Sequence, residues 1–256
     1  MNPKGYTHSP NLKPPNSKSN SMKLPITASL AALAIAIPFA LAQDAAKKPE
    51  SVKPGINSKF LDPKLNIRDW IGRFEVESRE VYHCREDVVK ALDLKPEMAI
   101  ADIGAGTGLY MEPFANAVGE KGKVYAVDIS EAFVKGLKDR AKKSEFSQVE
   151  VVLCKEDSVE LEPESIDLAF ICDTYHHFEY PGATLASIHT ALKPGGKLVV
   201  IDFERIEGKS REWIMGHVRA GKEVFSAEIK TAKFEQIKEV EIKGFKENYF
   251  LIFKKQ

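Results

Sequence analysis

The stretch that decides the fold is Ala101-Asp102-Ile103-Gly104-Ala105-Gly106-Thr107-Gly108, which follows an apolar run and precedes an amphipathic one. Glycines let the backbone turn sharply and let a ligand lie against peptide groups where a Cβ would clash. The helix N-terminus that follows presents free N–H groups. The segment therefore predicts a strand, a tight ligand-binding turn and a helix, in that order.

A second acid stands at the end of the next predicted strand. Asp128 lies about twenty residues beyond Gly108, where a carboxylate can accept hydrogen bonds from both hydroxyls of a ribose. Loop and acid together indicate a cofactor that contains a nucleoside. A dinucleotide is disfavoured, because such sites prefer G-x-G-x-x-G and because the carboxylate of Asp102 would repel a pyrophosphate.

Short apolar runs alternate with amphipathic stretches on both sides of this loop. The predicted strands are residues 98–103, 123–128, 149–153, 166–172 and 197–203, and the predicted helices between them are residues 109–118, 131–143 and 181–192. Continuous apolar runs are typical of parallel strands that helices cover on both faces. Repeated strand–helix units imply right-handed crossovers and hence a doubly wound α/β sheet.

The C-terminal region has a different pattern. Residues 211–233 predict one helix, and residues 236–242 and 249–253 predict two strands joined by a turn that contains Gly244. Such a hairpin requires at least one antiparallel strand. Upstream, residues 74–82 predict a helix over the cofactor cleft, with Tyr82 and Arg85 as candidate contacts to the acceptor; a surface amphipathic helix explains these residues equally well.

Four landmarks in this order resemble the class I S-adenosylmethionine (SAM)-dependent methyltransferases, over the chain from about Val81 onward. They are the loop from Asp102 to Gly108, the acid Asp128, Glu156-Asp157-Ser158 after the third strand, and Leu192-Lys193-Pro194-Gly195-Gly196 before the fifth. The resemblance implies a Rossmann-like, doubly wound, seven-stranded and mostly parallel sheet with an antiparallel C-terminal strand.

The resemblance also implies a cofactor, SAM, and a set of residues that bind it. SAM has no phosphate and carries an ammonium and a sulfonium group, so a carboxylate near the loop is favourable. The glycines would lie under the methionine part, Asp128 would hold the ribose, and Asp157 would accept from the adenine amino group unless it is merely an exposed loop acid. The candidate cofactor-binding residues are Asp102, Gly104, Ala105, Gly106, Gly108, Asp128, Ile129, Asp157, Ser158 and Asp173.

The segment after the fourth strand is expected to border the methyl acceptor, because ligands of open parallel sheets bind beyond the carboxyl ends of the strands. Tyr175, His176 and His177 are the candidate catalytic residues, as sources of a base. Alternatively, one histidine is structural, and alignment of the acceptor alone accelerates transfer. No metal is predicted, since side chains of neighbouring residues diverge at a strand end. Weaker candidates for acceptor recognition are residues 202–205, Trp213, His217 and Arg219.

Charge and the N-terminal sequence bear on partners and location. Residues 1–42 hold four lysines and no acid, so the rest of the chain has a net charge of −4, which argues against nucleic acid and for a small-molecule acceptor. Residues 1–21 predict a disordered extension, 22–42 a signal peptide or membrane anchor, 43–61 a linker, and 62–256 the methyltransferase domain. We therefore expect a protein that is exported, or anchored to the membrane through residues 22–42; its oligomeric state stays open.

The function that the sequence favours is transfer of a methyl group from SAM to a small molecule. Two alternatives stay open. One is a non-catalytic module that binds SAM or a related nucleoside, because the supply of SAM outside the cytoplasm is uncertain. The other is an oxidoreductase that uses a nicotinamide cofactor, which the glycine spacing and Asp102 disfavour.

Overall fold

The computed structural model describes residues 50–256. The predicted extension, the signal peptide or anchor, and residues 43–49 of the predicted linker lie outside the described residues. Within residues 50–256, no helix combines the length and the apolar character that crossing a bilayer requires.

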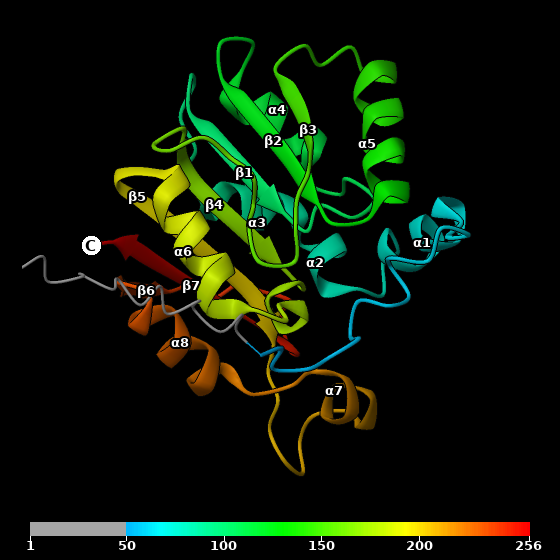
Figure 1. The fold of residues 1–256 in the computed structure, drawn as a ribbon, viewed down its shortest axis with the longest axis vertical. Coiled ribbons are helices and arrows are strands. Elements are labelled where there is room, and N and C mark those ends of the chain that lie inside the picture. Colours follow the sequence, from blue (N-terminus) through cyan, green and yellow to red (C-terminus); the bar gives the residue numbers. More distant parts are fainter. Residues whose placement is uncertain (1–49) are drawn as a thin grey trace, which may run out of the picture. The chain divides into compact units, whose positions relative to one another are not determined.

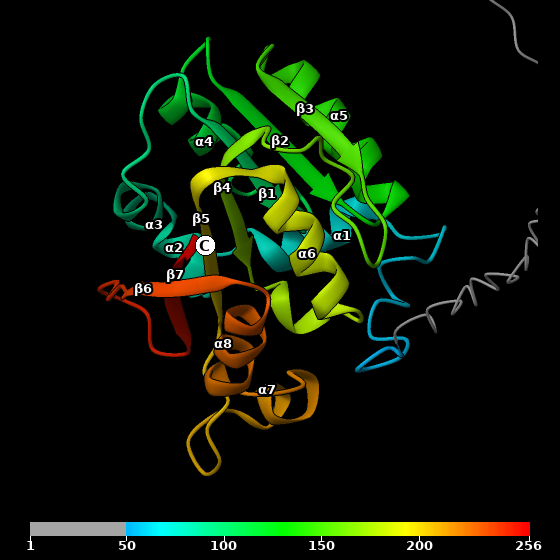
Figure 2. The same cartoon turned by 60° about the vertical axis from the view of Figure 1, so that its left-hand side comes forward.

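The described residues contain a seven-stranded sheet in the order β3-β2-β1-β4-β5-β7-β6 (Figures 1 and 2). Strands β1 to β5 are parallel, and β7 pairs antiparallel with both β5 and β6. The predicted mostly parallel sheet with an antiparallel last strand is therefore confirmed. The strands are β1 Ala99–Ile103, β2 Lys123–Asp128, β3 Val149–Leu153, β4 Ile166–Cys172, β5 Leu192–Phe203, β6 Phe234–Glu239 and β7 Asn248–Lys255.

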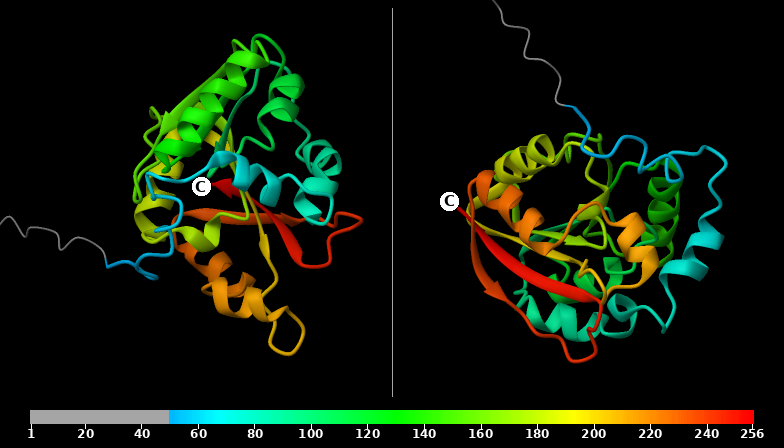
Figure 3. Two further views of the ribbon diagram at one scale, coloured as in Figure 1. Left: turned by 90° about the vertical axis from the view of Figure 1, so that its right-hand side faces the viewer. Right: turned by 90° about the horizontal axis from the view of Figure 1, so that it is seen from below.

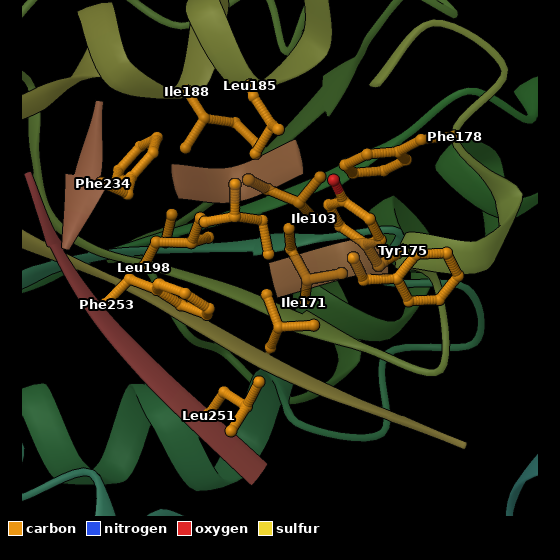
Figure 4. Packing of buried hydrophobic residues seen from close by; sticks show 14 of the residues in the cluster. Ile103, Ile171, Tyr175, Phe178, Leu185, Ile188, Leu198, Phe234, Leu251 and Phe253 are labelled. Atoms are coloured by element: carbon orange, nitrogen blue, oxygen red, sulfur yellow. The ribbon is translucent and has the colours of Figure 1, made fainter. Parts of the chain in front are cut away.

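Helices cover both faces of the sheet because successive strand residues point to opposite sides. Phe114 of α4 packs with Ile100 and Phe170 on one face, and α2 and α3 join this layer. Ile188 of α6 and Phe225 of α8 pack on the other face, and Figure 4 shows part of that core. The helices are α1 Ile67–Phe74, α2 Glu80–His83, α3 Arg85–Ala91, α4 Met111–Val118, α5 Glu131–Lys143, α6 Pro181–Ala191, α7 Glu212–His217 and α8 Lys222–Thr231, with a 3-10 turn η1 at Tyr175–His177.

Strand β3 departs from the prediction that the parallel strands are covered on both faces. It lies at the edge of the sheet, pairs only with β2, and has partly or fully exposed side chains throughout. Val149 and Val151 pack on the side of α5, which runs beside this edge (Figure 1), and Val152 packs in part against the core on the opposite face. A continuous apolar run does not distinguish an edge strand from a central one.

The predicted helix over residues 211–233 is wrong in one respect, because the chain forms two helices there. Helix α7 ends at His217, Val218 is extended, and α8 begins after Gly221. Glycine is a poor helix former, so Gly216 and Gly221 lower the cost of the break. As a result α7 lies beyond the carboxyl end of β5, separate from α8, which packs near β6 and β7 (Figures 2 and 3).

The N-terminal part of the domain also differs from the prediction. Residues 74–82 are not one helix: α1 ends at Phe74, α2 begins at Glu80, and Arg79 between them is extended. The guanidinium of Arg79 donates to the Phe74 carbonyl at 3.1 Å and so fixes this connector. Residues 50–61, predicted as linker, pack on the domain, where the buried Asn57 donates to the carbonyl of His177 at 3.0 Å.

Candidate cofactor site and histidine cluster

The glycine loop connects β1 to α4 and is held against β2. The N–H groups of Gly104 and Ala105 both donate to the carbonyl of Val127, at 2.8 and 3.0 Å. Gly104, Gly106 and Gly108 have φ values of 78°, 55° and 86°, a region that favours glycine. A Cβ on Gly104 would lie 2.2 Å from Cγ2 of Thr174. The loop therefore requires glycine both for its backbone conformation and for its contact with the segment after β4.

Two buried carboxylates flank this loop. Oδ2 of Asp128 accepts from the N–H of Gly106 and Oδ1 accepts from the N–H of Ser130, both at 2.8 Å. Burial raises the pKa of Asp128 to about 6, although these hydrogen bonds counteract the rise. Burial and the neighbouring Asp128 raise the pKa of Asp102 to about 8. Two acids so close together in a buried loop favour a ligand that carries positive charge.

The loop also contains a polar atom that protein groups leave unsatisfied. Oγ1 of Thr107 is buried and has no hydrogen-bond partner among the described residues. Buried polar groups normally have a partner, so an orphaned hydroxyl in a binding loop points to a ligand or a water. Asp102, Asp128 and this hydroxyl are polar groups that suit the ammonium, sulfonium and ribose groups of SAM. Gly106, which has no Cβ, leaves space beside them.

Four aromatic side chains pack together beside the glycine loop, with Phe74 nearest to it, and we call them the aromatic cover: Phe60, Trp70, Phe74 and Phe133. The ring centroids of Trp70 lie 4.9 Å from Phe60 and 5.1 Å from Phe74. A Cβ on Gly106 would lie 3.5 Å from the Phe74 ring. These rings come from α1, from the residues before it and from α5, and not from the helix predicted over residues 74–82.

The candidate residues of the adenine side follow β2 and β3. Ile129 is half-buried between Asp128 and the start of α5. Asp157 and Ser158 are half-buried in a short turn, where the N–H of Lys155 donates to the Ser158 carbonyl at 2.9 Å. Because β1, β2 and β3 are parallel, these residues lie beyond the same carboxyl ends of the strands as the glycine loop.

Asp173 is engaged by side chains of the protein itself. It accepts from Nη2 of Arg79 at 2.5 Å and from Nδ2 of Asn248 at 2.7 Å. Burial raises its pKa, and the charge of Arg79 counteracts that rise. Its φ of 48° turns the chain at the end of β4. Asp173 therefore links Arg79, which precedes α2, to Asn248 of β7 at the carboxyl end of β4. The sequence around Asp173 does not predict these two contacts.

Tyr175 does not lie where a catalytic base was predicted. Its side chain is fully buried in the core between Phe178 and Phe225 (Figure 4). The hydroxyl donates to Oε2 of Glu228 at 2.9 Å, and burial raises its pKa. The prediction is wrong because η1 turns this residue inward, against α8, where a phenol can satisfy its polar end and bury its ring.

His176 and His177 do not diverge, contrary to the sequence prediction, because they lie on the η1 turn rather than on a strand. Their ring centroids are 4.3 Å apart. Nδ1 of His176 lies 2.8 Å from Oδ1 of the buried Asp202, and Nε2 of His177 lies 3.3 Å from Nε2 of His217 on α7. Burial lowers the pKa of His177 to about 2 and that of His217 to about 4, so both rings are neutral at physiological pH.

This histidine cluster could not be found from spacing. His217 follows His177 by forty positions, and only the break between α7 and α8 brings it beside η1. The sequence did single out His217 and residues 202–205 for acceptor recognition. Tyr82 and Arg85, the other acceptor candidates, stack on each other, with the guanidinium carbon 4.4 Å from the ring centroid.

Comparison with known proteins agrees with this geometry. Residues 101–200 match a family model described as a methyltransferase domain. A ubiquinone/menaquinone biosynthesis C-methyltransferase from Cupriavidus metallidurans is 27% identical over 114 residues, which make up 44% of this chain and 46% of that protein. The chain thus matches less than half of the length of this curated relative.

Solved structures extend the similarity over most of the described domain. A SAM-dependent methyltransferase from Aquifex aeolicus matches with a TM-score of 0.65 and 27% identity, over 75% of this chain and 99% of that one. The [4+2]-cyclase SpnF matches with a TM-score of 0.62 at 14% identity, over 81% of this chain and 96% of that one, which shows the shared fold alone. Residues 101–200 thus match a methyltransferase domain, and the glycine loop and the strand order of the described domain are similar to those of SAM-dependent methyltransferases.

Proposed function

We propose that this protein transfers the methyl group of SAM to a small-molecule acceptor. The observation that carries the proposal is the pair of buried acids, Asp102 and Asp128, beside a glycine loop at the carboxyl ends of β1 and β2. Their raised pKa values mean that the folded protein leaves negative charge poorly compensated there. A cofactor with an ammonium, a sulfonium and a ribose matches that arrangement.

Each candidate residue has a distinct task in this proposal. Asp102 faces the positive charges of the methionine part, and the glycine loop lets that part lie against the backbone. Asp128 uses its remaining lone pairs for the ribose hydroxyls, since each carboxylate oxygen accepts more than one hydrogen bond. Ile129 packs on the adenine, and Asp157 and Ser158 bind its polar edge. When bound, SAM supplies an electrophilic methyl group on its sulfonium.

The acceptor pocket in this proposal lies between the end of β4, η1 and α7. Asp202 holds His176 through Nδ1 at 2.8 Å, so His176 presents Nε2. The aromatic cover excludes water from the glycine loop and strengthens electrostatic interactions there. Two observations support a small organic acceptor. The net charge of −4 outside residues 1–42 argues against nucleic acid, and the curated relative is a methyltransferase of ubiquinone and menaquinone biosynthesis.

Calorimetric titration of the purified chain with SAM and with its demethylated product tests the donor site. We expect Asp128→Asn to weaken binding by roughly 10- to 100-fold, the effect of losing about 1.5–3 kcal/mol from charged hydrogen bonds. Asp167→Asn is the matched control, because Asp167 also accepts from a backbone N–H, that of Ala99, but at the opposite end of the sheet. Absence of SAM binding by the folded wild type would exclude this function.

Detection of binding alone does not distinguish an enzyme from a non-catalytic SAM-binding module. Turnover of SAM to its demethylated product, measured with a panel of quinone precursors and other small phenols, separates the two. A protein that binds SAM and methylates none of them supports the binding module.

We also propose that residues 22–42 export the domain or anchor it to the membrane. The support is the sequence: Lys23 precedes an apolar stretch that ends in Ala40-Leu41-Ala42. Fusion of residues 1–61 to alkaline phosphatase, which is active only outside the cytoplasm, tests this. An inactive fusion would exclude export.

A further inference from the structure

We propose that His176, His177 and His217 form a binding site for one divalent transition-metal ion of the zinc type. One ring nitrogen from each of these residues lies within 4.8 Å of the others, the only such group of potential ligands within residues 50–256. Imidazole nitrogen is a preferred ligand of zinc and its neighbours in the first transition row. The three side chains come from η1 and α7, elements far apart in the sequence.

The distance between two of the ligands agrees with a tetrahedral ion. Nε2 of His177 and Nε2 of His217 are 3.3 Å apart. A zinc ion with Zn–N bonds of about 2.0–2.1 Å and tetrahedral angles places its ligand atoms roughly 3.3–3.4 Å apart. One N–H···N hydrogen bond would also give this distance, so the third histidine is what distinguishes a metal site from a simple pair.

His176 has the environment of a metal-binding histidine. Its Nδ1 lies 2.8 Å from Oδ1 of Asp202, whose side chain has no exposed surface. Asp202 is itself fixed, because it accepts from the backbone N–H groups of His176 and Phe203. A carboxylate that accepts from Nδ1 leaves the lone pair on Nε2, which is the arrangement that recurs behind zinc-bound histidines.

The backbones of the other two ligands are held by residues 50–61. Asn57 donates to the carbonyl of His177, and Nζ of Lys53 donates to the carbonyl of His217 at 2.6 Å. The Lys53 charge opposes a cation nearby, and the carboxylate of Asp202 offsets it. Nδ1 of His177 is buried and has no hydrogen-bond partner among the described residues, so the polar contact of this ring is the one between its Nε2 and Nε2 of His217.

Aromatic rings surround the cluster. Trp213 stacks on His217 with ring centroids 4.7 Å apart, and Phe60 lies edge-on to His177 at 5.1 Å. Such walls limit the access of water and keep the imidazoles in the neutral form that binds metals. Three nitrogen ligands leave a fourth position, which zinc sites of this composition fill with water or with an anionic oxygen or sulfur atom of a small molecule.

Titration with Co²⁺ tests the proposal, with the full chain carrying no histidine tag and stripped of metal by a chelator. We expect one equivalent to bind and to give the visible absorption of tetrahedral cobalt. Loss of a hydrogen-bond partner of a metal ligand weakens metal binding by about 10- to 100-fold, and loss of the ligand itself weakens it more. We therefore expect His217→Gln to weaken Co²⁺ binding by at least about 100-fold. His189→Gln is the matched control, because His189 lies on α6 and contacts Gln256 instead.

Circular dichroism and thermal melting establish that each variant folds. His177→Gln serves as the second ligand variant if His217→Gln does not fold. The proposal is overturned if the folded wild type binds less than one equivalent, or if the folded ligand variants titrate like His189→Gln. SAM binding, measured separately, does not enter this test, so the metal site and the proposed SAM site succeed or fail independently.

Discussion

At the scale of single residues, Gly104 combines two constraints that a substitution would break together. Gly104→Ala introduces a Cβ within 2.2 Å of Thr174 at a φ of 78°. Strain of this kind costs about 1–3 kcal/mol, and each kcal/mol lowers the melting temperature of a domain of this size by roughly 2–4 °C. We expect a melting temperature lower by roughly 2–12 °C, together with weaker SAM binding.

Gly182→Ala is the control for that substitution. Gly182 lies in the first turn of α6, its φ is not positive, and nothing lies within 4 Å of a Cβ placed there. Such a change alters stability by less than about 1 kcal/mol. Equal melting temperatures for the two variants, measured by calorimetry, would contradict the steric role given to Gly104.

The raised pKa of Asp102 implies that the stability of the domain depends on pH. Its pKa is about 8 in the folded protein and 3.8 when unperturbed, so the folded state retains a proton that the unfolded state has released. Stability therefore falls as pH rises between about 4 and 8 and is constant with respect to this group above that range. Asp128 of β2 titrates in the same window, and Tyr110 and Cys172 face Asp102 from α4 and β4.

Asp102→Asn removes this proton and isolates its contribution. Urea denaturation at pH values from 5 to 9 should show the variant gaining stability relative to wild type as pH rises to about 8. Asp128 is present in both proteins, so the difference reports Asp102 together with its interaction with Asp128. A difference in the free energy of unfolding that does not change with pH would contradict the raised pKa of Asp102.

The conformation of the glycine loop follows from the local sequence, whereas the orientations of the side chains after β4 do not. Asp102, the glycines and Asp128 are local features, because their positions follow from where a strand ends and a loop turns. Tyr175, His176 and His177 are also adjacent in sequence, but their orientations depend on η1 and on what packs against it. Glu228 and Asp202 decide those orientations, and neither stands near them in the chain.

At the scale of elements, the connector between α1 and α2 depends on one ion pair. Nη2 of Arg79 lies 2.5 Å from Oδ2 of Asp173, whose side chain is 8% exposed. Removal of one partner leaves a buried charge without compensation, at a cost of about 3–5 kcal/mol for fully buried pairs and less where one partner is partly exposed, as Arg79 is. We expect Arg79→Met to destabilise the domain and to loosen the aromatic cover.

A double-mutant cycle measures this coupling. Arg79→Met, Asp173→Asn and the double variant should show an interaction energy of at least about 1 kcal/mol in urea denaturation, because the double variant leaves no unpaired charge. The pair Arg211 and Glu247 is a control on the surface, where ion pairs contribute about 1 kcal/mol or less. Additive effects at Arg79 and Asp173 would show that the connector is held by packing alone.

The sequence predicts element boundaries well where the apolar pattern is strong. The prediction fails where a few residues override helix propensity. Residues 131–143 were predicted as a helix and form α5 with those bounds. Residues 211–233 have a continuous helical pattern, yet Val218 is extended between two helices. Ile214 and Val218 are both buried, and because residues four apart lie on one face of a continuous helix, their spacing gives no local signal of the break.

At the scale of the whole described domain, the carboxyl ends of the parallel strands bring together two sites of different chemistry. The aromatic cover lies beside the glycine loop, and the histidine cluster lies between η1 and α7. Phe60 contacts both, with its ring 4.9 Å from Trp70 and 5.1 Å from His177. The doubly wound sheet, predicted from the alternation of strands and helices, places the carboxyl ends of the strands together. Phe60 lies in residues 50–61, which have no periodic pattern, so its position could not be predicted in the same way.

The two tryptophans of the chain report separately on these two sites. Trp70 lies in the aromatic cover, and Trp213 stacks on His217 at 4.7 Å. In Trp213→Phe, SAM should change the fluorescence of Trp70, because the ligand displaces or orders the rings beside the glycine loop. In Trp70→Phe, SAM should leave Trp213 nearly unchanged, whereas Co²⁺, which quenches a nearby ring, should reduce its emission. A response of Trp213 to SAM as large as that of Trp70 would show that the cover and the histidine cluster act as one site.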